Sequence, residues 1–456
     1  MAAQIGNSLT SSKPDVTDPI YFLHIPKTAG SAFRSFIDDH FAVGEVTPWW
    51  PIEEHLLKLS REQLLEYKAY VGHYGWYLPA LVRIPLRIVT VLRDPVDRTF
   101  SHFHDLRTSP QDWLHDVIKS NRWTFEDFVL SDLGKSELTN FMIRHIAFDD
   151  IQQDFWGHSP KRDHDLPGLL KKYSDESLLD IALERLESCE VVGLFERFSD
   201  SLRLTSHKFG WAPTASFRRH NSTRGSRSGE EVTERAREAI AEMTQLDQHI
   251  YDWAKRRFEA ELRGLTDEQM ESDYVQRMRL LPREKRVNWK FERPINGVGW
   301  SQRQWFKSLH PRLKEDVARF ACVNGATFVD VPLEQGAAYE VRFFARNLPS
   351  STPHQIQLRV NDVVVPMRTW QSRYDTADDS VWSGIASAEI IARNSAYTRV
   401  CFEKTSNLEV SQRQPEGLLS RIKAGMMAQR TGETTTIDEP IASGIEMRWL
   451  EIIQVS

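Results

Sequence analysis

Two short segments of this sequence place cationic side chains where an anion could bind. In the first, the apolar stretch that ends at His24 runs into residues 26–31, which read Pro-Lys-Thr-Ala-Gly-Ser, and a helix is expected to begin at about Ser31. A loop of this kind directs backbone N–H groups and a helix N-terminus at one spot, and Lys27 adds a mobile positive charge there. The segment therefore predicts a binding site for a phosphate or sulfate group.

The second segment repeats this strand, loop and helix order. Residues 87–92 are β-branched or aliphatic with little alternation, as in a buried parallel strand. Asp94 suits the N-cap and Pro95 the first position of a following helix, which puts Arg93 at the carboxyl end of the strand. Ser101 follows about two helical turns later. An arginine and a serine so placed could hold a phosphate from two sides.

A histidine between these segments has the chemistry of a general base. His73 follows the apolar step Ala69–Gly72, which itself follows an amphipathic helix expected over about 59–68. If the step is a strand, His73 lies at the carboxyl edge of an open α/β sheet, where such sheets bind ligands. Imidazole titrates near neutrality, which suits a proton acceptor. Two alternatives stay open: a structural histidine bonded to backbone, or a carboxylate base at Glu53 or Glu54.

The Pro-Lys-Thr-Ala-Gly-Ser loop, followed by Arg-Asp-Pro and a serine eight residues after the arginine, resembles sulfotransferases that use 3′-phosphoadenosine 5′-phosphosulfate (PAPS). The string that begins at His24 is most similar to the heparan sulfate 2-O-sulfotransferase branch, which includes many bacterial members. In that family the first loop holds the 5′-phosphosulfate and the second turn binds the 3′-phosphate. The resemblance implies a metal-free donor site made of Lys27, Thr28, Ala29, Gly30, Ser31, Arg93 and Ser101.

The resemblance also implies two catalytic roles. Lys27 would stabilise the charge that grows on the leaving oxygen, and His73 would take the proton of the acceptor hydroxyl. The branch often has His-Gly-His where this chain has Val71-Gly72-His73, so the first histidine is missing. Segment 189–202 matches a further family pattern, Val-Gly…Glu-Arg-Phe…Ser-Leu, and the basic loop 216–228 corresponds to one that closes over the nucleotide.

Two other functions stay open on the sequence. A nucleotide kinase or NTPase with a divergent phosphate loop would hold magnesium with Thr28, directly after Lys27, but the Walker spacing Gly-x-x-x-x-Gly-Lys is absent. A non-catalytic glycan-binding protein could carry a degenerate sulfotransferase domain. The presence of Lys27, Arg93 and His73 argues against that second alternative.

The composition limits the possible binding partners and the cellular compartment. The net charge of −6 argues against general nucleic-acid binding but allows a local basic cleft. No apolar run is long enough for a membrane span, and the polar start lacks the features of a signal peptide, so no membrane anchor is expected. Three scattered cysteines indicate no disulfide framework. We expect a cytoplasmic, bacterial-type enzyme whose partners are PAPS, its product 3′,5′-adenosine bisphosphate (PAP), and a glycan or other hydroxyl acceptor.

The 456 residues are too many for one ordinary domain. Residues 18–262 alternate short strands with longer helices and predict a three-layer α/β domain around a parallel sheet, which the resemblance makes P-loop-like. Residues 263–290 are highly charged and favour a linker, and residues 1–17 favour a disordered N-terminus. From 291 to 456, strands and polar turns predict an all-β sandwich domain, a class that includes carbohydrate-binding accessory modules.

The same patterns place individual elements. Helices are expected at 124–130, 178–186 and 230–263. In the second part of the chain, β-rich runs predict strands at 327–331, 339–347, 355–360, 397–403 and 447–455.

Overall fold

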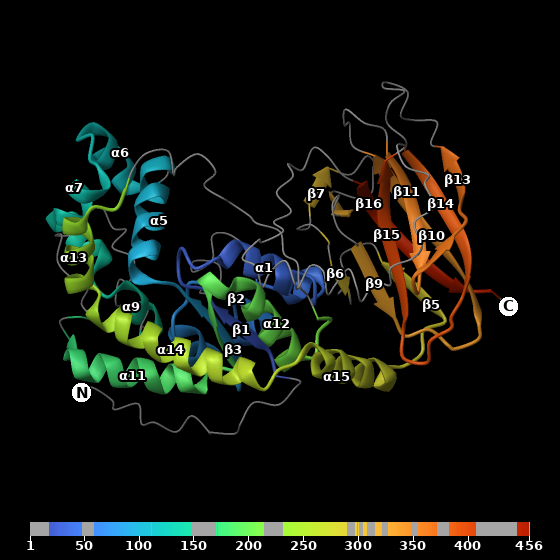
Figure 1. Cartoon of the computed structure of the whole chain (residues 1–456), viewed down its shortest axis with the longest axis horizontal. Coiled ribbons are helices and arrows are strands. Elements are labelled where there is room, and N and C mark those ends of the chain that lie inside the picture. The colour runs from blue at the N-terminus through green and yellow to red at the C-terminus, as the bar shows by residue number, and fades with distance from the viewer. Residues whose placement is uncertain are drawn as a thin grey trace. The chain divides into compact units, whose positions relative to one another are not determined.

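The chain forms two compact units, one built on a parallel sheet and one on antiparallel sheets (Figure 1). The first unit comprises Met1–Gly30, Gly44–Leu204 and Asn221–Gly264, and the second comprises Ser31–Val43, Thr205–His220 and Leu265–Ser456. The computed structural model describes residues 18–47, 59–110, 112–147, 170, 172–213, 231–289, 297–298, 300, 304–307, 315–321, 327–347, 354–371, 383–406 and 445–455. The expected N-terminal disorder, Glu53, Glu54 and the loop 216–228 therefore lie outside the described residues.

The first unit contains a four-stranded sheet in the order β2-β1-β3-β4, with every pair parallel. Its strands are β1 (Ile20–Leu23), β2 (Ala69–Gly72), β3 (Arg87–Leu92) and β4 (Val191–Leu194). Every residue of these strands is buried, which explains why their sequences do not alternate between apolar and polar. The strand order changes direction between β1 and β3, and open α/β sheets bind ligands at such a point.

The helix after β3 begins as its sequence predicts. Asp94 caps α5 (Pro95–Thr108) by accepting hydrogen bonds from the N–H groups of Val96 and Asp97, with Pro95 in the first position. The other helical elements that the structure describes before residue 264 are α1 (Gly30–Asp38), η1 (Val43–Glu45), α3 (Arg61–Leu64), α4 (Tyr77–Val82), α6 (Trp113–Ser120), α7 (Phe125–Leu130), α8 (Asp132–Leu138), α9 (Phe141–Ala147), α11 (Asp175–Ser188), η2 (Phe195–Arg197), α12 (Phe198–Phe209), α13 (Glu234–Met243) and α14 (Gln245–Arg263).

Two expected helices differ from the structure in extent. The helix expected over 59–68 is a single turn, because α3 ends at Leu64 and the chain then turns toward β2. The helix expected over 230–263 is two helices separated at Thr244, which ends α13 and precedes α14. The side chain of Thr244 donates to the carbonyl oxygen of Ile240 (2.7 Å) at this break.

The second unit contains two antiparallel sheets that pack face to face, so the predicted α/β and β-sandwich-like layout is confirmed. The five expected strands correspond to β9 (Thr327–Val331), β10 (Ala338–Asn347), β11 (His354–Val360), β15 (Thr398–Ser406) and β16 (Ile445–Gln454). Seven further strands were not predicted: β5 (Arg286–Trp289), β6 (Gly297–Val298), β7 (Gln304–Lys307), β8 (Glu315–Ala321), β12 (Val363–Val365), β13 (Arg368–Gln371) and β14 (Ser383–Ile391).

The core of this unit is contributed by both sheets. One sheet runs β13-β14-β10-β16-β8-β7, with β5 also paired to β16, and the other runs β12-β11-β15-β9-β6. Buried residues alternate along β10, where Tyr339, Val341 and Phe343 face the core. The ring of Phe343 lies 5.2 Å from that of Phe402 on β15, in the opposite sheet, which shows that the two inner faces interdigitate.

The interval expected as a linker contains regular structure. It holds α15 (Asp267–Leu280) and the strand β5. Tyr274 of α15 donates a hydrogen bond to Asp330 of β9 (2.9 Å), and Asp330 forms an ion pair with Arg399 of β15 (2.7 Å). The interval is therefore attached to the sandwich by a buried polar contact.

The chain passes between the two units five times, and two of these crossings lie in α-helices. The division falls after Gly30 at the start of α1 and after Leu204 within α12. In the second unit, Trp211 stacks on His40 (3.9 Å between ring centroids) and meets Phe36 of α1 edge to face. Neither unit is therefore a continuous stretch of sequence.

Candidate functional site

The segments predicted to form the functional site follow the carboxyl ends of the four parallel strands, so they lie at one edge of the sheet. β1 leads into His24 and the 26–31 loop, β2 into His73, β3 into Arg93, and β4 into Phe195. The placement of His73 directly after a short strand is confirmed. Segments that lie far apart in the sequence thus come together where parallel sheets bind ligands.

The 26–31 loop contains backbone conformations that residues other than glycine rarely adopt. Lys27 and Ala29 both have φ of 71°, in the left-handed region, and α1 begins at Gly30. The hydroxyl of Thr28 is buried and donates to the carbonyl oxygen of Ile25 (2.7 Å). The proton of this hydroxyl is therefore already used, and only the backbone N–H of Thr28 can donate to an anion.

Arg93 links the two predicted anion-binding segments. Its guanidinium donates to the carbonyl oxygen of Lys27 (3.0 Å) and lies 3.9 Å from the centre of the Phe195 ring, which follows β4. The next residue, Asp94, donates its N–H to the carboxylate of Glu196 (2.9 Å). The ends of β1, β3 and β4 are therefore joined through one short turn.

The ammonium group of Lys27 pairs with a carboxylate that the sequence did not single out. Its Nζ lies 3.1 Å from Oδ1 of Asp105 on α5, with the two side chains 24% and 51% exposed. Asp105 follows Ser101 by four residues, so both lie on the same face of α5. That face also receives Lys27, and the helical period alone could have indicated Asp105 as a neighbour of the donor site.

The hydrogen bond of His73 fixes which ring nitrogen can act as a base. Nδ1 lies 2.7 Å from the backbone carbonyl oxygen of His24. A carbonyl oxygen only accepts, so Nδ1 carries the proton and the neutral ring keeps a lone pair on Nε2. The structural and the catalytic interpretations of His73 are therefore compatible, because the backbone bond selects the tautomer that a general base requires.

Other imidazoles lie beside His73. The ring of His24 is 4.1 Å from it and that of His145 is 6.5 Å from it, measured between centroids. Burial holds the pKa of His145 well below its ordinary value, although a hydrogen bond to Phe141 opposes this effect and the charge of His73 reinforces it. Sequence analysis gave no signal for His145, because its approach depends on the packing of α9.

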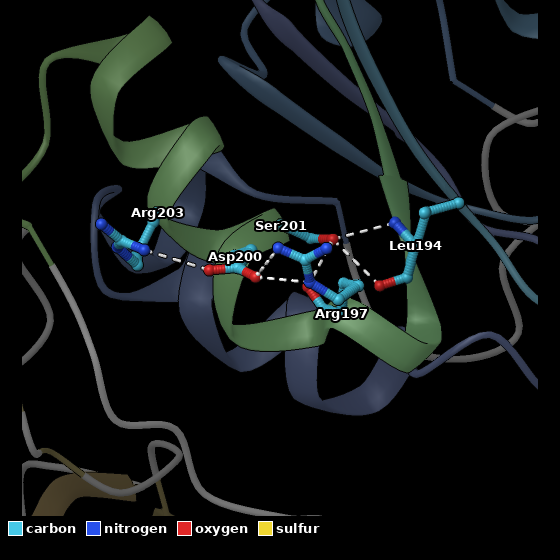
Figure 2. Close-up of polar contacts among 5 residues, drawn as sticks. All are labelled: Leu194, Arg197, Asp200, Ser201 and Arg203. Atoms are coloured by element: carbon cyan, nitrogen blue, oxygen red, sulfur yellow. Dashed lines mark hydrogen bonds and ion pairs between the residues drawn. The ribbon is translucent and has the colours of Figure 1, made fainter. Parts of the chain in front are cut away.

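Packing at the end of β4 accounts for the residue types in segment 189–202, whose sequence resembles a family pattern (Figure 2). The hydroxyl of Ser201 accepts from the N–H of Leu194 (2.8 Å) and lies within 3.1 Å of the carbonyl oxygens of Leu194 and Arg197. A Cβ at Gly193 would lie 2.8 Å from the Ser201 side chain, so only glycine fits there. Asp200 forms ion pairs with Arg197 and Arg203 beside this turn.

A buried polar cluster packs against α5 and α9. Asp247 of α14 accepts hydrogen bonds from the N–H groups of Met142 (3.0 Å) and Ile143 (2.8 Å), and burial raises its pKa. Arg98 of α5 is 1% exposed and stacks on Phe141 (3.9 Å), and burial lowers its pKa to about 9. These contacts fix the helix that carries Ser101 and Asp105.

Groups of three or more histidine, cysteine or carboxylate side chains that could hold a metal are absent from the described part of the chain. Among the helices that the structure describes, none is both long and apolar enough to cross a bilayer. Cys189 and Cys401 are free and buried, and Cys322 lies outside the described residues.

Comparisons with known proteins do not assign the chain to a family. No family model and no curated protein matches it. Among solved structures it is similar to the CBM22-1 xylan-binding domain from Paenibacillus barcinonensis Xyn10C, with 8% identity, a TM-score of 0.19, and coverage of 37% of this chain and 94% of that domain. It is also similar to the catalytic domain of a GH87 alpha-1,3-glucanase in complex with nigerose, with 7% identity, a TM-score of 0.14, and coverage of 31% and 22%. At these TM-scores neither likeness carries an argument about function.

Proposed function

We propose that this protein is a PAPS-dependent O-sulfotransferase that acts on a saccharide hydroxyl, with the parallel-sheet unit as a P-loop-like catalytic domain. The observation that carries the proposal is the hydrogen bond from Arg93 to the carbonyl oxygen of Lys27. The bond joins the 26–31 loop to the turn after β3. A donor with phosphate groups at both ends of its ribose would need two anion-binding segments side by side in this way. The family resemblance of both segments adds to this geometric argument.

In the proposed site, the backbone N–H groups of residues 28–31 bind the 5′-phosphosulfate, and Arg93 and Ser101 bind the 3′-phosphate. The acceptor hydroxyl passes its proton to Nε2 of His73 as its oxygen attacks sulfur. The bond from sulfur to the bridging oxygen breaks, and PAP leaves with the electron pair. Lys27 stabilises the charge that develops on that oxygen, so its interaction is stronger in the transition state than in the ground state.

Binding of the desulfated product gives the first test. Calorimetric titration of the whole chain with PAP in the absence of magnesium should show saturable binding. Arg93→Ala should weaken it by tenfold or more, because a charge-assisted bond of about 1.5–3 kcal/mol is removed. Arg197→Ala is the matched control, since Arg197 pairs with Asp200 rather than with the 26–31 loop. Absence of PAP binding, or tight ATP binding that requires magnesium, would reject the proposal, the latter in favour of an NTPase.

Turnover gives the second test. With labelled PAPS and a panel of sulfated and unsulfated glycans, lipid alcohols and small alcohols, we expect transfer to a glycan. Lys27→Ala and His73→Ala should remove turnover while the thermal unfolding midpoint stays close to that of the parent. Near-normal turnover of His73→Ala would show that another group is the base.

A further inference from the structure

We propose that His24 is a positioning residue that couples the donor loop to the general base. This inference rests on the proposed function and assigns a role to a residue outside the sequence-predicted site. It follows from four contacts of His24, one through its backbone carbonyl oxygen and three through its imidazole ring.

The first two contacts hold His73. The backbone carbonyl oxygen of His24 accepts the Nδ1 proton of His73 at 2.7 Å, which selects the tautomer. The ring of His24 lies against the ring of His73, with centroids 4.1 Å apart and planes inclined by 30°. One residue therefore fixes both the protonation pattern of the base and the plane in which its Nε2 can point.

Two further contacts involve the His24 ring. The buried ring of Phe22 on β1 stacks on it, with an inclination of 11° and a centroid distance of 5.5 Å. The ring also covers Gly30, where an added Cβ would lie only 1.6 Å from Nε2 and 1.9 Å from Cε1. The imidazole thus contacts Phe22 of the sheet, the first residue of α1 and the base.

This arrangement gives Gly30 a reason to be glycine that does not involve the donor. A Cβ there would have to push the His24 ring aside, and the displaced ring would no longer support His73. Conversely, an anion that orders the loop at Gly30 also orders the ring that sets the base. His145 is the third imidazole near His73, and it lies farther away, with ring centroids 6.5 Å apart.

The experiment compares His24→Ala, His24→Phe, Gly30→Ala and the double variant His24→Ala/Gly30→Ala. We expect His24→Ala to lower kcat by about tenfold or more, the range in which a misplaced general base acts, while the affinity for PAP changes by less than about threefold. His24→Phe keeps a stacking face and the backbone carbonyl, so it should recover most of kcat. Gly30→Ala should lower kcat on its own. In the double variant it should lower kcat little beyond the effect of His24→Ala, because the ring that the new Cβ would displace is already absent.

Imidazole NMR of His73 makes the coupling measurable apart from catalysis. Every variant keeps the backbone carbonyl oxygen of His24, so all should show the tautomer with the proton on Nδ1. The His73 ring signals should be the same in the parent and His24→Phe, and shifted and broadened in His24→Ala and Gly30→Ala, because the ring is less well ordered there. Three results would contradict the proposed coupling between His24 and His73. They are a kcat of His24→Ala equal to that of the parent, a His73 spectrum that does not change in that variant, and additive effects of His24→Ala and Gly30→Ala on kcat. If the parent chain neither binds PAP nor turns over PAPS, the proposed function fails, and the spectra still decide whether His24 orients His73.

Discussion

Lys27 and Asp105 form an ion pair in which Nζ and Oδ1 are 3.1 Å apart, so the cation of the 26–31 loop already has a counter-ion on α5. An anionic donor must compete with this carboxylate or share the ammonium group with it. The pair is partly exposed, with more than half of the Asp105 side chain accessible, which limits its strength. We therefore expect Asp105 to weaken anion binding at Lys27 without preventing it.

Asp105→Asn should strengthen PAP binding. Removing the carboxylate frees Lys27 and makes the local potential more positive, and an exposed ion pair is worth at most about 1 kcal/mol, which corresponds to a gain of up to about fivefold. The gain should shrink as salt is added. Calorimetry at two ionic strengths measures it, with Asp116→Asn on α6 as a control at an exposed carboxylate. Weaker binding in Asp105→Asn would show that the carboxylate orders Lys27 for the ligand instead.

Arg93→Lys should reproduce most of the loss caused by Arg93→Ala. A lysine keeps the charge, but it cannot stack its end group on Phe195 and donate to Lys27 with the same planar fork. We expect PAP affinity to fall by about tenfold, equivalent to 1.4 kcal/mol. Arg197→Lys provides the matched comparison. Equal affinities of Arg93→Lys and the parent would mean that only the charge at position 93 matters.

The features that local sequence determines were predicted well. The run 87–92 is a strand, and Asp94 with Pro95 starts the next helix, because burial pattern and capping chemistry involve only neighbouring residues. His73 was placed at a strand end on the same grounds.

The features that depend on tertiary contacts were not predicted. Thr244 divides two helices without a glycine or proline to mark the break. Strands such as β14 lack a strong pattern of their own and are selected by pairing with β10. The contact of His24 with His73 joins residues far apart in the chain, so spacing could not reveal it.

Ser201→Ala should destabilise the turn after β4. It leaves the buried N–H of Leu194 without the hydroxyl that accepts its hydrogen bond, at a cost of about 1–3 kcal/mol. For a unit of this size the thermal midpoint should fall by a few degrees. Ser188→Ala, at an exposed hydroxyl at the end of α11, should change it very little. An unchanged midpoint in Ser201→Ala would show that the turn does not depend on this hydroxyl.

The stability of the first unit should fall as the pH is lowered below about 6.5. Burial lowers the pKa of both His102 and His145 from the ordinary value of 6.5, so the unfolded chain binds protons that the folded chain does not. Stability is therefore complete above 6.5 and is lost as the pH falls toward the folded pKa values, by up to about 1.4 kcal/mol per pH unit for each histidine. Denaturant titrations between pH 7.5 and 5 measure the slope.

His145→Phe tests the origin of this slope. The variant removes one of the two groups, so its stability should depend less steeply on pH. His249→Asn, at an exposed histidine of α14, should keep the slope of the parent. A parental slope in His145→Phe would assign the acid sensitivity to other groups.

Asp330→Asn should destabilise the second unit. Asp330 is 1% exposed and holds the guanidinium of Arg399 through two bonds of 2.7 Å, while also accepting from Tyr274. Removing its charge leaves a largely buried arginine uncompensated, with an expected cost of about 3 kcal/mol. Tyr274→Phe removes one hydrogen bond and should cost about 1 kcal/mol. Equal thermal midpoints for Asp330→Asn and the parent would contradict this account.

The repeated crossings of the chain between its units bear on how the protein can be divided into fragments. A truncation at Gly264 would discard the sandwich and α15, yet it would retain most of α1 and the segment around Trp211, which belong to the same compact unit as the discarded part. A single cut is thus a poor route to a working fragment, and every assay is best made on the uncut chain.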